Sequence, residues 1–180
     1  MISISEFIQL QSITIKDHSK LVSLMNRIYP PAYNYLWTHK DCNFYFERFY
    51  NINHFKNELA EKEAEYYFVY YETKLTGILR VHFNKALKTM SKKSGCYVNR
   101  IYLSEETQGK GIGNELMNWI EQRAKAHGND LIWLEAMDSK KQALQFYTKL
   151  GFTNSHEARL DFEPLLVDFR GMIVFYKTLK

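Results

Sequence analysis

A glycine-rich loop at residues 108–113, with the sequence Gln-Gly-Lys-Gly-Ile-Gly, is the clearest chemical feature of this chain. It holds three of the chain's eight glycines and separates the apolar stretch 98–103 from a segment with helical periodicity. Glycine lets backbone amides come close to a ligand, and the first amides of a helix have no acceptor within it. The loop therefore predicts a phosphate site, to which Lys110 would add a positive charge.

Two common phosphate-binding motifs do not fit this loop. A P-loop needs Gly-x-x-x-x-Gly-Lys followed by Ser or Thr, and no segment of the chain has that spacing. A dinucleotide fingerprint needs a third glycine where this chain has Asn114 or Leu116. The loop does fit the pattern Gln-x-x-Gly-x-Gly, and a second motif, Phe-Tyr-Thr-Lys-Leu-Gly-Phe at residues 146–152, follows after one predicted strand.

The two motifs, in this order over residues 98–152, resemble the GNAT acetyltransferase superfamily. More weakly, residues 8–17 resemble the family's first strand and helix, and residues 170–179 its last strand. The resemblance implies an α/β fold with a mixed central sheet flanked by helices. It also implies a parallel strand pair that splays apart to form a cleft for acetyl-CoA, the co-substrate.

The resemblance assigns cofactor contacts to two stretches of backbone. One stretch pairs with the pantetheine arm like an added strand, and the other holds the pyrophosphate. Lys140 is a further cofactor contact, at a position where the family often has asparagine. The predicted cofactor-binding residues of the two stretches are Ile101, Tyr102, Leu103, Gln108, Gly109, Lys110, Gly111, Ile112 and Gly113.

Tyr147 is the predicted general acid, because the tyrosine at this place in the family often faces the cofactor sulfur. A phenol with a pKa of about 10 can protonate a departing thiolate whose conjugate acid has a pKa of about 8.5. The same tyrosine also lies on the apolar face of its predicted helix, near Ala143 and Leu150, so a core role is the alternative.

The general base is not fixed by the sequence. Many relatives carry a glutamate where this chain has Asn99, and an amide cannot accept a proton at neutral pH, although it can hold an ordered water. His82 on the preceding strand is a candidate base with a suitable pKa, and a structural histidine is the alternative. Glu105, Glu106 and a water relay are further candidates for this role.

The amine acceptor, a small molecule or a peptide, is expected against the N-terminal half of the chain. Residues 29–55 hold ten aromatic side chains, which would form either a wall for a cationic or planar substrate or part of the core. A polyamine would fit if Asp41 and Glu47 lined that wall.

Length and composition, with 46% hydrophobic residues, indicate a single domain over residues 1–180. The resemblance implies that it is an N-acetyltransferase domain. We expect a cytoplasmic protein, since the chain has no leader pattern or membrane-spanning stretch, and Cys42 and Cys96 form no paired motif. The six histidines show no metal-ligand spacing, so no metal is expected. A homodimer is compatible with the sequence.

Residue patterns place the elements as follows. A helix over 17–28 is expected to stop at Pro30-Pro31, and a hairpin at residues 66–83 turns at residues 72–74. A helix after the glycine loop buries every fourth residue from 112 to 124 and ends at Gly128. The strands before and after it form a parallel pair, and the next helix is capped by Asp138 or Ser139 and ends before Gly151. Two strands complete the chain.

Two other function classes compete with the transferase. The chain would be a non-catalytic acyl-CoA-binding or sensing domain if it lacks a base. It would be a nucleic-acid-binding module if its net charge of +4 were gathered on one face, but the lysines and arginines are dispersed, so no nucleic-acid partner is expected.

Overall fold

The computed structural model describes residues 1–179, which form an α/β fold with one mixed eight-stranded sheet in the order β1-β2-β3-β4-β5-β6-β8-β7. The strands are β1 (Ile2–Ser3), β2 (Ile8–Ser12), β3 (Ala64–Tyr71), β4 (Lys74–His82), β5 (Gly95–Leu103), β6 (Leu131–Met137), β7 (Thr153–Arg159) and β8 (Gly171–Thr178). The helices are α1 (His18–Tyr33), α2 (Asn43–Phe49), α3 (Ile52–Ala60), α4 (Ile112–Ala126) and α5 (Lys141–Lys149). The predicted fold class is confirmed.

The described residues gather into two compact units. The first unit comprises residues 1–80 and 100–116, and the second comprises residues 81–99 and 117–179. Each unit is described by itself below.

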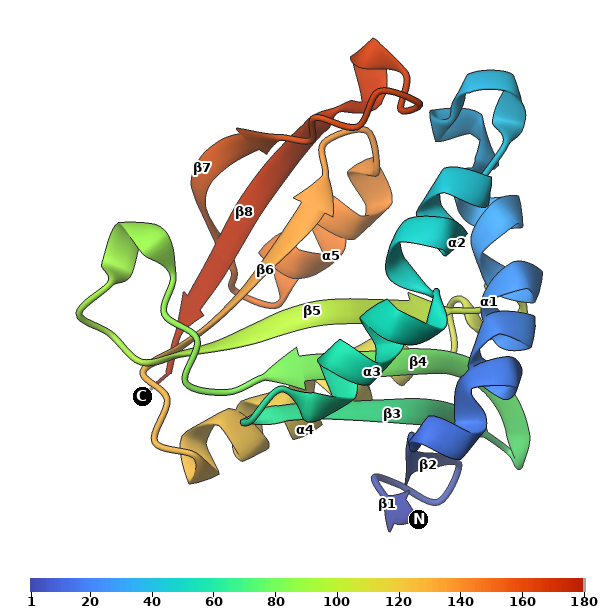
Figure 1. Cartoon of the computed structure of the whole chain (residues 1–180). Helices are drawn as coiled ribbons and strands as arrows, with labels where there is room; N and C mark the ends of the chain where they lie inside the picture. Colours follow the sequence, from blue (N-terminus) through green and yellow to red (C-terminus); the bar gives the residue numbers. More distant parts are fainter. Residues whose placement is uncertain (180) are drawn as a thin grey trace. The chain divides into compact units, whose positions relative to one another are not determined.

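In the first unit, β2 and β3 pair antiparallel from Ile8 opposite Tyr71 to Ser12 opposite Tyr67. Figure 1 shows α3 lying across β3, against which it packs. Phe55 of α3 and Phe68 of β3 are fully buried and belong to this unit's core. The predicted hairpin is confirmed, because β3 and β4 are joined by a turn at Glu72 and Thr73 with positive φ.

The prediction that Pro30-Pro31 stops the first helix is wrong. α1 continues to Tyr33, and the amide of Asn34 still donates a hydrogen bond to the carbonyl of Pro30. Proline lacks an amide, which weakens a helix, but its fixed φ is compatible with a helical turn. The rings of Tyr29 and Tyr33 stack with centroids 4.7 Å apart, and this packing stabilises the last turn.

In the second unit, β6 lies between β5, with which it is parallel, and β8, with which it is antiparallel. The β5–β6 register covers Gly95–Val98 and Leu131–Leu134, whereas β6 stays paired with β8 as far as Met137. The parallel pair was therefore predicted correctly. Leu131 packs with Leu87 and Val174 in the core of this unit.

The helix predictions after the glycine loop hold with one exception. The stripe Ile112, Leu116, Ile120 and Ala124 is buried, and Gly128 and Gly151 follow their helices with φ of +70° and +86°. The predicted cap of α5 is wrong. Lys140 takes the N-cap position and makes no capping hydrogen bond with its side chain, whereas the Asp138 carboxylate packs against Gly171.

Candidate functional site

The glycine loop has the backbone conformation that an anion cradle needs. β5 ends at Leu103, a helical turn follows at Glu105–Thr107, and α4 starts at Ile112. Gly109 and Gly111 have φ of +75° and +76°, a region that residues with side chains rarely occupy. A Cβ added to either glycine would have no protein atom within 4 Å, so the space in front of both residues is open.

The loop presents several amide donors that the protein itself does not use. The amide of Glu115 donates back to the carbonyl of Gly111 at 3.2 Å, which begins the hydrogen bonding of α4. Five amides that precede Glu115 donate to no backbone acceptor within residues 1–179. They are the amides of Gly109, Gly111, Ile112, Gly113 and Asn114. Such a group of amides at a helix N-terminus favours a phosphate or pyrophosphate.

Lys110 extends from the loop toward the end of β3. Its Nζ lies 5.0 Å from the centroid of the Tyr71 ring, a cation–π distance. The structure therefore holds the lysine beside the predicted phosphate loop and against an aromatic ring. Its contact with a phosphate stays a prediction, and so does that of the exposed Gln108.

The end of β5, residues 101–103, lies beyond the part of β5 that pairs with β6. On its other side this end meets the start of β4, since the Ser104 amide donates to the Thr76 carbonyl at 2.8 Å. A Cβ on Gly77 would overlap the carbonyl oxygen of Tyr102, so glycine is required there for the two strands to come this close.

The Tyr102 side chain points into an aromatic cluster formed with α1 and α2. Its hydroxyl and that of Tyr45 lie 2.9 Å apart, and its ring meets those of Tyr29 and Tyr33 edge-on. Tyr29 and Tyr45 stack with centroids 4.0 Å apart, and burial raises the pKa of Tyr45 well above its usual value. These tyrosines therefore stay neutral and serve as core.

Asp41 and Glu47 are the two acidic residues whose position at an aromatic wall would favour a polyamine acceptor. Asp41 and Glu47 are both exposed. The Asp41 carboxylate accepts hydrogen bonds from the backbone and side chain of Asn43, which fixes the turn before α2. Several of the segment's aromatics, including Trp37, Tyr45 and Tyr50, are buried. The core alternative therefore holds for these residues.

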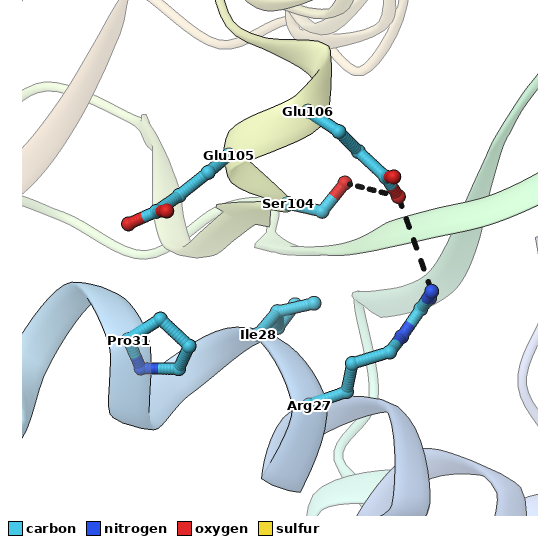
Figure 2. A pocket seen from close by; sticks show the side chains of 6 residues that line it. All are labelled: Arg27, Ile28, Pro31, Ser104, Glu105 and Glu106. Atoms are coloured by element: carbon cyan, nitrogen blue, oxygen red, sulfur yellow. Dashed lines mark hydrogen bonds and ion pairs between the residues drawn. The ribbon is translucent and has the colours of Figure 1, made fainter.

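A pocket of about 220 Å³ opens beside the end of β5 (Figure 2). It is lined by Arg27, Ile28 and Pro31 of α1 and by Ser104, Glu105 and Glu106. Glu106 lies 3.9 Å from Arg27 and 3.3 Å from the Ser104 hydroxyl, which donates to it. Glu105 points away from Arg27 and has no partner within residues 1–179, so its carboxylate is available to a ligand.

Sequence reasoning missed a buried ion cluster behind β5. The Glu58 carboxylate of α3 lies 2.6 Å from the Arg100 guanidinium and 3.9 Å from that of Arg80, and all three side chains are buried. A second carboxylate, Glu61, pairs with Arg80 at 2.9 Å. The sequence offered one signal for this cluster, the arginine residues within apolar strands. A buried charge requires a partner of opposite charge, so these arginines indicated that carboxylates would lie nearby.

The other predicted catalytic residues belong to the second unit. Tyr147 is buried on α5, and its ring centroid lies 5.8 Å from that of Phe152 and 6.0 Å from that of Phe175. This packing gives it a core role, and its role as an acid is an open prediction. His82 Nδ1 lies 2.9 Å from the carbonyl oxygen of Phe83, so that nitrogen holds the proton in the neutral ring and Nε2 is the basic one.

Asn99 and Lys140 lie at half-buried positions of this second unit, and each residue has an interaction partner. The two cysteines, Cys42 and Cys96, are buried free thiols, and burial raises the pKa of Cys42. A raised pKa disfavours the nucleophilic thiolate. No metal-ligating group of His, Cys, Asp or Glu was found among residues 1–179.

Comparison of this chain with known proteins identifies its family. A family model described as Acetyltransferase (GNAT) family matches residues 22–152. The chain belongs to the GNAT family. The GNAT match covers both motifs that carried the resemblance, the glycine loop and the Phe146-Tyr147 segment, and it supports an acyltransferase activity.

Individual GNAT relatives are distant in sequence. An uncharacterized N-acetyltransferase in the pepI 3′ region of Lactobacillus delbrueckii subsp. lactis is 20% identical over 83% of this chain and 87% of its own length. A spermine/spermidine N(1)-acetyltransferase from Bacillus subtilis is 26% identical over 66% of this chain and 74% of its own.

Solved GNAT structures share the fold. PaiA N-acetyltransferase from Thermoplasma acidophilum, solved in complex with coenzyme A, aligns with a TM-score of 0.70 at 17% identity, over 95% of this chain and 98% of its own. Within residues 1–179, no helix is both long and apolar enough to cross a membrane.

Proposed function

We propose that this chain is an acetyl-CoA-dependent N-acetyltransferase, a single domain over residues 1–180 that transfers an acetyl group directly to a primary amine in a ternary complex. The observation that carries the proposal is the group of unused amides at residues 109–114, in a chain of the GNAT family. A pyrophosphate is an anion that such a group of donors suits.

The backbone of residues 101–103 would pair with the pantetheine amides, and residues 108–113 would hold the pyrophosphate. Lys110 would leave the Tyr71 ring to reach a phosphate, and Lys140 would add a further contact. The coenzyme A complex of the PaiA relative supports acetyl-CoA as the co-substrate.

Tyr147 is the proposed acid for the leaving thiolate. An amine with a pKa of about 10.4 must lose a proton before it attacks, and Asn99 cannot accept it. Asn99 would instead hold a water, while His82 through Nε2, or Glu105 in the pocket of Figure 2, would take the proton.

The acceptor is proposed to be a small-molecule or peptide amine. The spermine/spermidine N(1)-acetyltransferase among the relatives supports a small polyamine as the first acceptor to test. We also propose a cytoplasmic location, since Cys42 and Cys96 are free thiols. The molar mass in solution, measured by light scattering, will distinguish a monomer from a homodimer.

Direct transfer makes a specific kinetic claim. When the enzyme meets acetyl-CoA without an amine, no thiol should be released and no acetyl group should appear on the protein, because neither cysteine is an activated nucleophile. Rapid quench followed by mass spectrometry of the protein tests this. A burst of thiol with an acetylated protein would exclude direct transfer.

One observation favours a second candidate function. Asn99 leaves the position where relatives carry a glutamate without a proton acceptor, which suits an acyl-CoA-binding or sensing domain that catalyses nothing. Such a domain would bind acetyl-CoA in calorimetry and acetylate no amine in a broad panel.

A further inference from the structure

An exposed carboxylate on β6 of the second unit is held in place by a buried tyrosine. The Tyr97 hydroxyl donates a hydrogen bond to Oε2 of Glu135 at 2.7 Å. The Tyr97 ring stacks on that of Trp133 with centroids 4.0 Å apart, and Lys85 Nζ lies 5.0 Å from its centroid. Since only 9% of Tyr97 is exposed, packing fixes the phenol, and the phenol in turn orients the Glu135 carboxylate.

The other oxygen of this carboxylate is available to a ligand. Within residues 1–179, Tyr97 is the side-chain partner of Glu135, and no hydrogen bond or ion pair involves Oε1. Because Glu135 is exposed, a donor from solvent can reach Oε1 without displacing a protein group. An ammonium is a suitable donor, since its hydrogen bond to a carboxylate is assisted by charge.

Glu135 lies where β5 and β6 stop pairing. The last paired residues are Val98 and Leu134, so Glu135 is the first residue of β6 beyond this pairing. On its other side Glu135 stays paired with Val174 of β8, which keeps its backbone in the sheet. The cleft for acetyl-CoA is expected where the two parallel strands separate. The fold therefore holds an oriented carboxylate at the start of that separation.

The titratable groups around Glu135 come from β5, β7, β8 and the segment before β5. They are Tyr97, His156, Tyr176 and Lys85. Glu157 of β7 is also exposed, but it lies on the opposite face, because its partner Ile173 alternates with Val174, the partner of Glu135. Among the described strand residues on its face of the second unit, Glu135 is thus the only carboxylate.

We propose that Glu135 is the catalytic base for the acceptor amine, a role left open above between His82 and Glu105. This inference rests on the proposed function. Oε1 takes one proton from the ammonium and passes it to solvent. The neutral nitrogen then bonds to the acetyl carbon as the carbon–sulfur bond breaks, and the second proton that the nitrogen loses balances the one that Tyr147 gives to the thiolate. With a base on β6, the chain needs no glutamate at Asn99.

Steady-state kinetics of the whole chain with acetyl-CoA and an accepted amine test this role. Glu135→Gln keeps the size of the side chain and removes its basicity, so kcat at pH 7 should fall about 100-fold or more. The Kd for acetyl-CoA, measured by calorimetry, should stay that of the wild type. Glu135→Asp should retain more activity than Glu135→Gln, and Glu157→Gln is the matched control, with a wild-type kcat expected. Circular dichroism checks that each variant folds.

The pH profile separates a base from a structural residue. The kcat of the wild type should fall at acid pH, as the base takes up a proton, and Glu135→Gln should lack this acid limb. Tyr97 is a positioning residue, so Tyr97→Phe should lower kcat less and keep the limb. A wild-type kcat in Glu135→Gln, or an unchanged acid limb, would overturn this inference alone. If the wild type releases no thiol with any amine, the proposed function fails and this inference fails with it.

Discussion

A pair of glycine variants separates the ligand role of the loop from its folding role. Gly111 and Gly128 have nearly the same conformation, with φ of +76° and +70°, and an added Cβ would meet no protein atom within 4 Å at either position. A side chain in this region costs roughly 1–2 kcal/mol. Gly111→Ala and Gly128→Ala are therefore expected to lose similar amounts of unfolding free energy, measured with urea.

Their effects on coenzyme A binding should differ. At Gly111 the methyl group enters the open space before amides that have no protein acceptor, whereas Gly128 only ends α4. Losing one hydrogen bond to a phosphate costs about 1.5–3 kcal/mol, which is about 10- to 150-fold in Kd. Calorimetric titration should thus give a Kd raised by at least about tenfold for Gly111→Ala and a wild-type Kd for Gly128→Ala.

Two results would refute this reasoning. If Gly111→Ala binds coenzyme A as tightly as the wild type, the loop amides do not hold the phosphates. If both variants lose affinity equally, the loss follows from stability and says nothing about the loop.

Three further predictions address catalysis, packing and pH. Tyr147→Phe should lower kcat about tenfold with little change in KM, since the phenolic proton is lost; an unchanged kcat with rate-limiting chemistry excludes the acid role. Gly77→Ala should cost about 1–3 kcal/mol in urea unfolding, because its Cβ overlaps the Tyr102 carbonyl. The hydrogen bond from Lys177 lowers the pKa of Glu121. The ionised Glu121 carboxylate therefore stabilises the fold above the usual carboxyl pKa, and this stabilisation is lost as the pH falls through the lowered pKa. In Glu121→Gln, the free energy of unfolding, measured with urea, should fall less steeply over this acid range.

Local signals were sufficient for the elements around the loop. The four-residue spacing from Ile112 to Ala124 and the glycine at 128 describe α4 without any knowledge of its neighbours. The end of α1 was different, because the stacking of Tyr33 on Tyr29 outweighs the tendency of Pro30 to break a helix. Propensity alone does not contain such tertiary contacts.

The loop could be predicted as a candidate site because its amide donors are close together in the sequence. The ion cluster was not, since Glu58, Arg80 and Arg100 come from α3, β4 and β5 and meet only in the folded chain. Tyr147 illustrates a third case, in which one side chain satisfies the pattern of a core residue and that of a catalytic residue at once.

Amine-dependent thiol release from acetyl-CoA is the most direct test of the proposed activity. The purified chain is incubated with acetyl-CoA and a panel of primary amines that includes spermidine and short peptides, and the products are identified by mass spectrometry. The account predicts thiol release only when an accepted amine is present, with the acetyl group on that amine. Tight binding of acetyl-CoA with no transfer to any amine would contradict it and would favour the sensing domain.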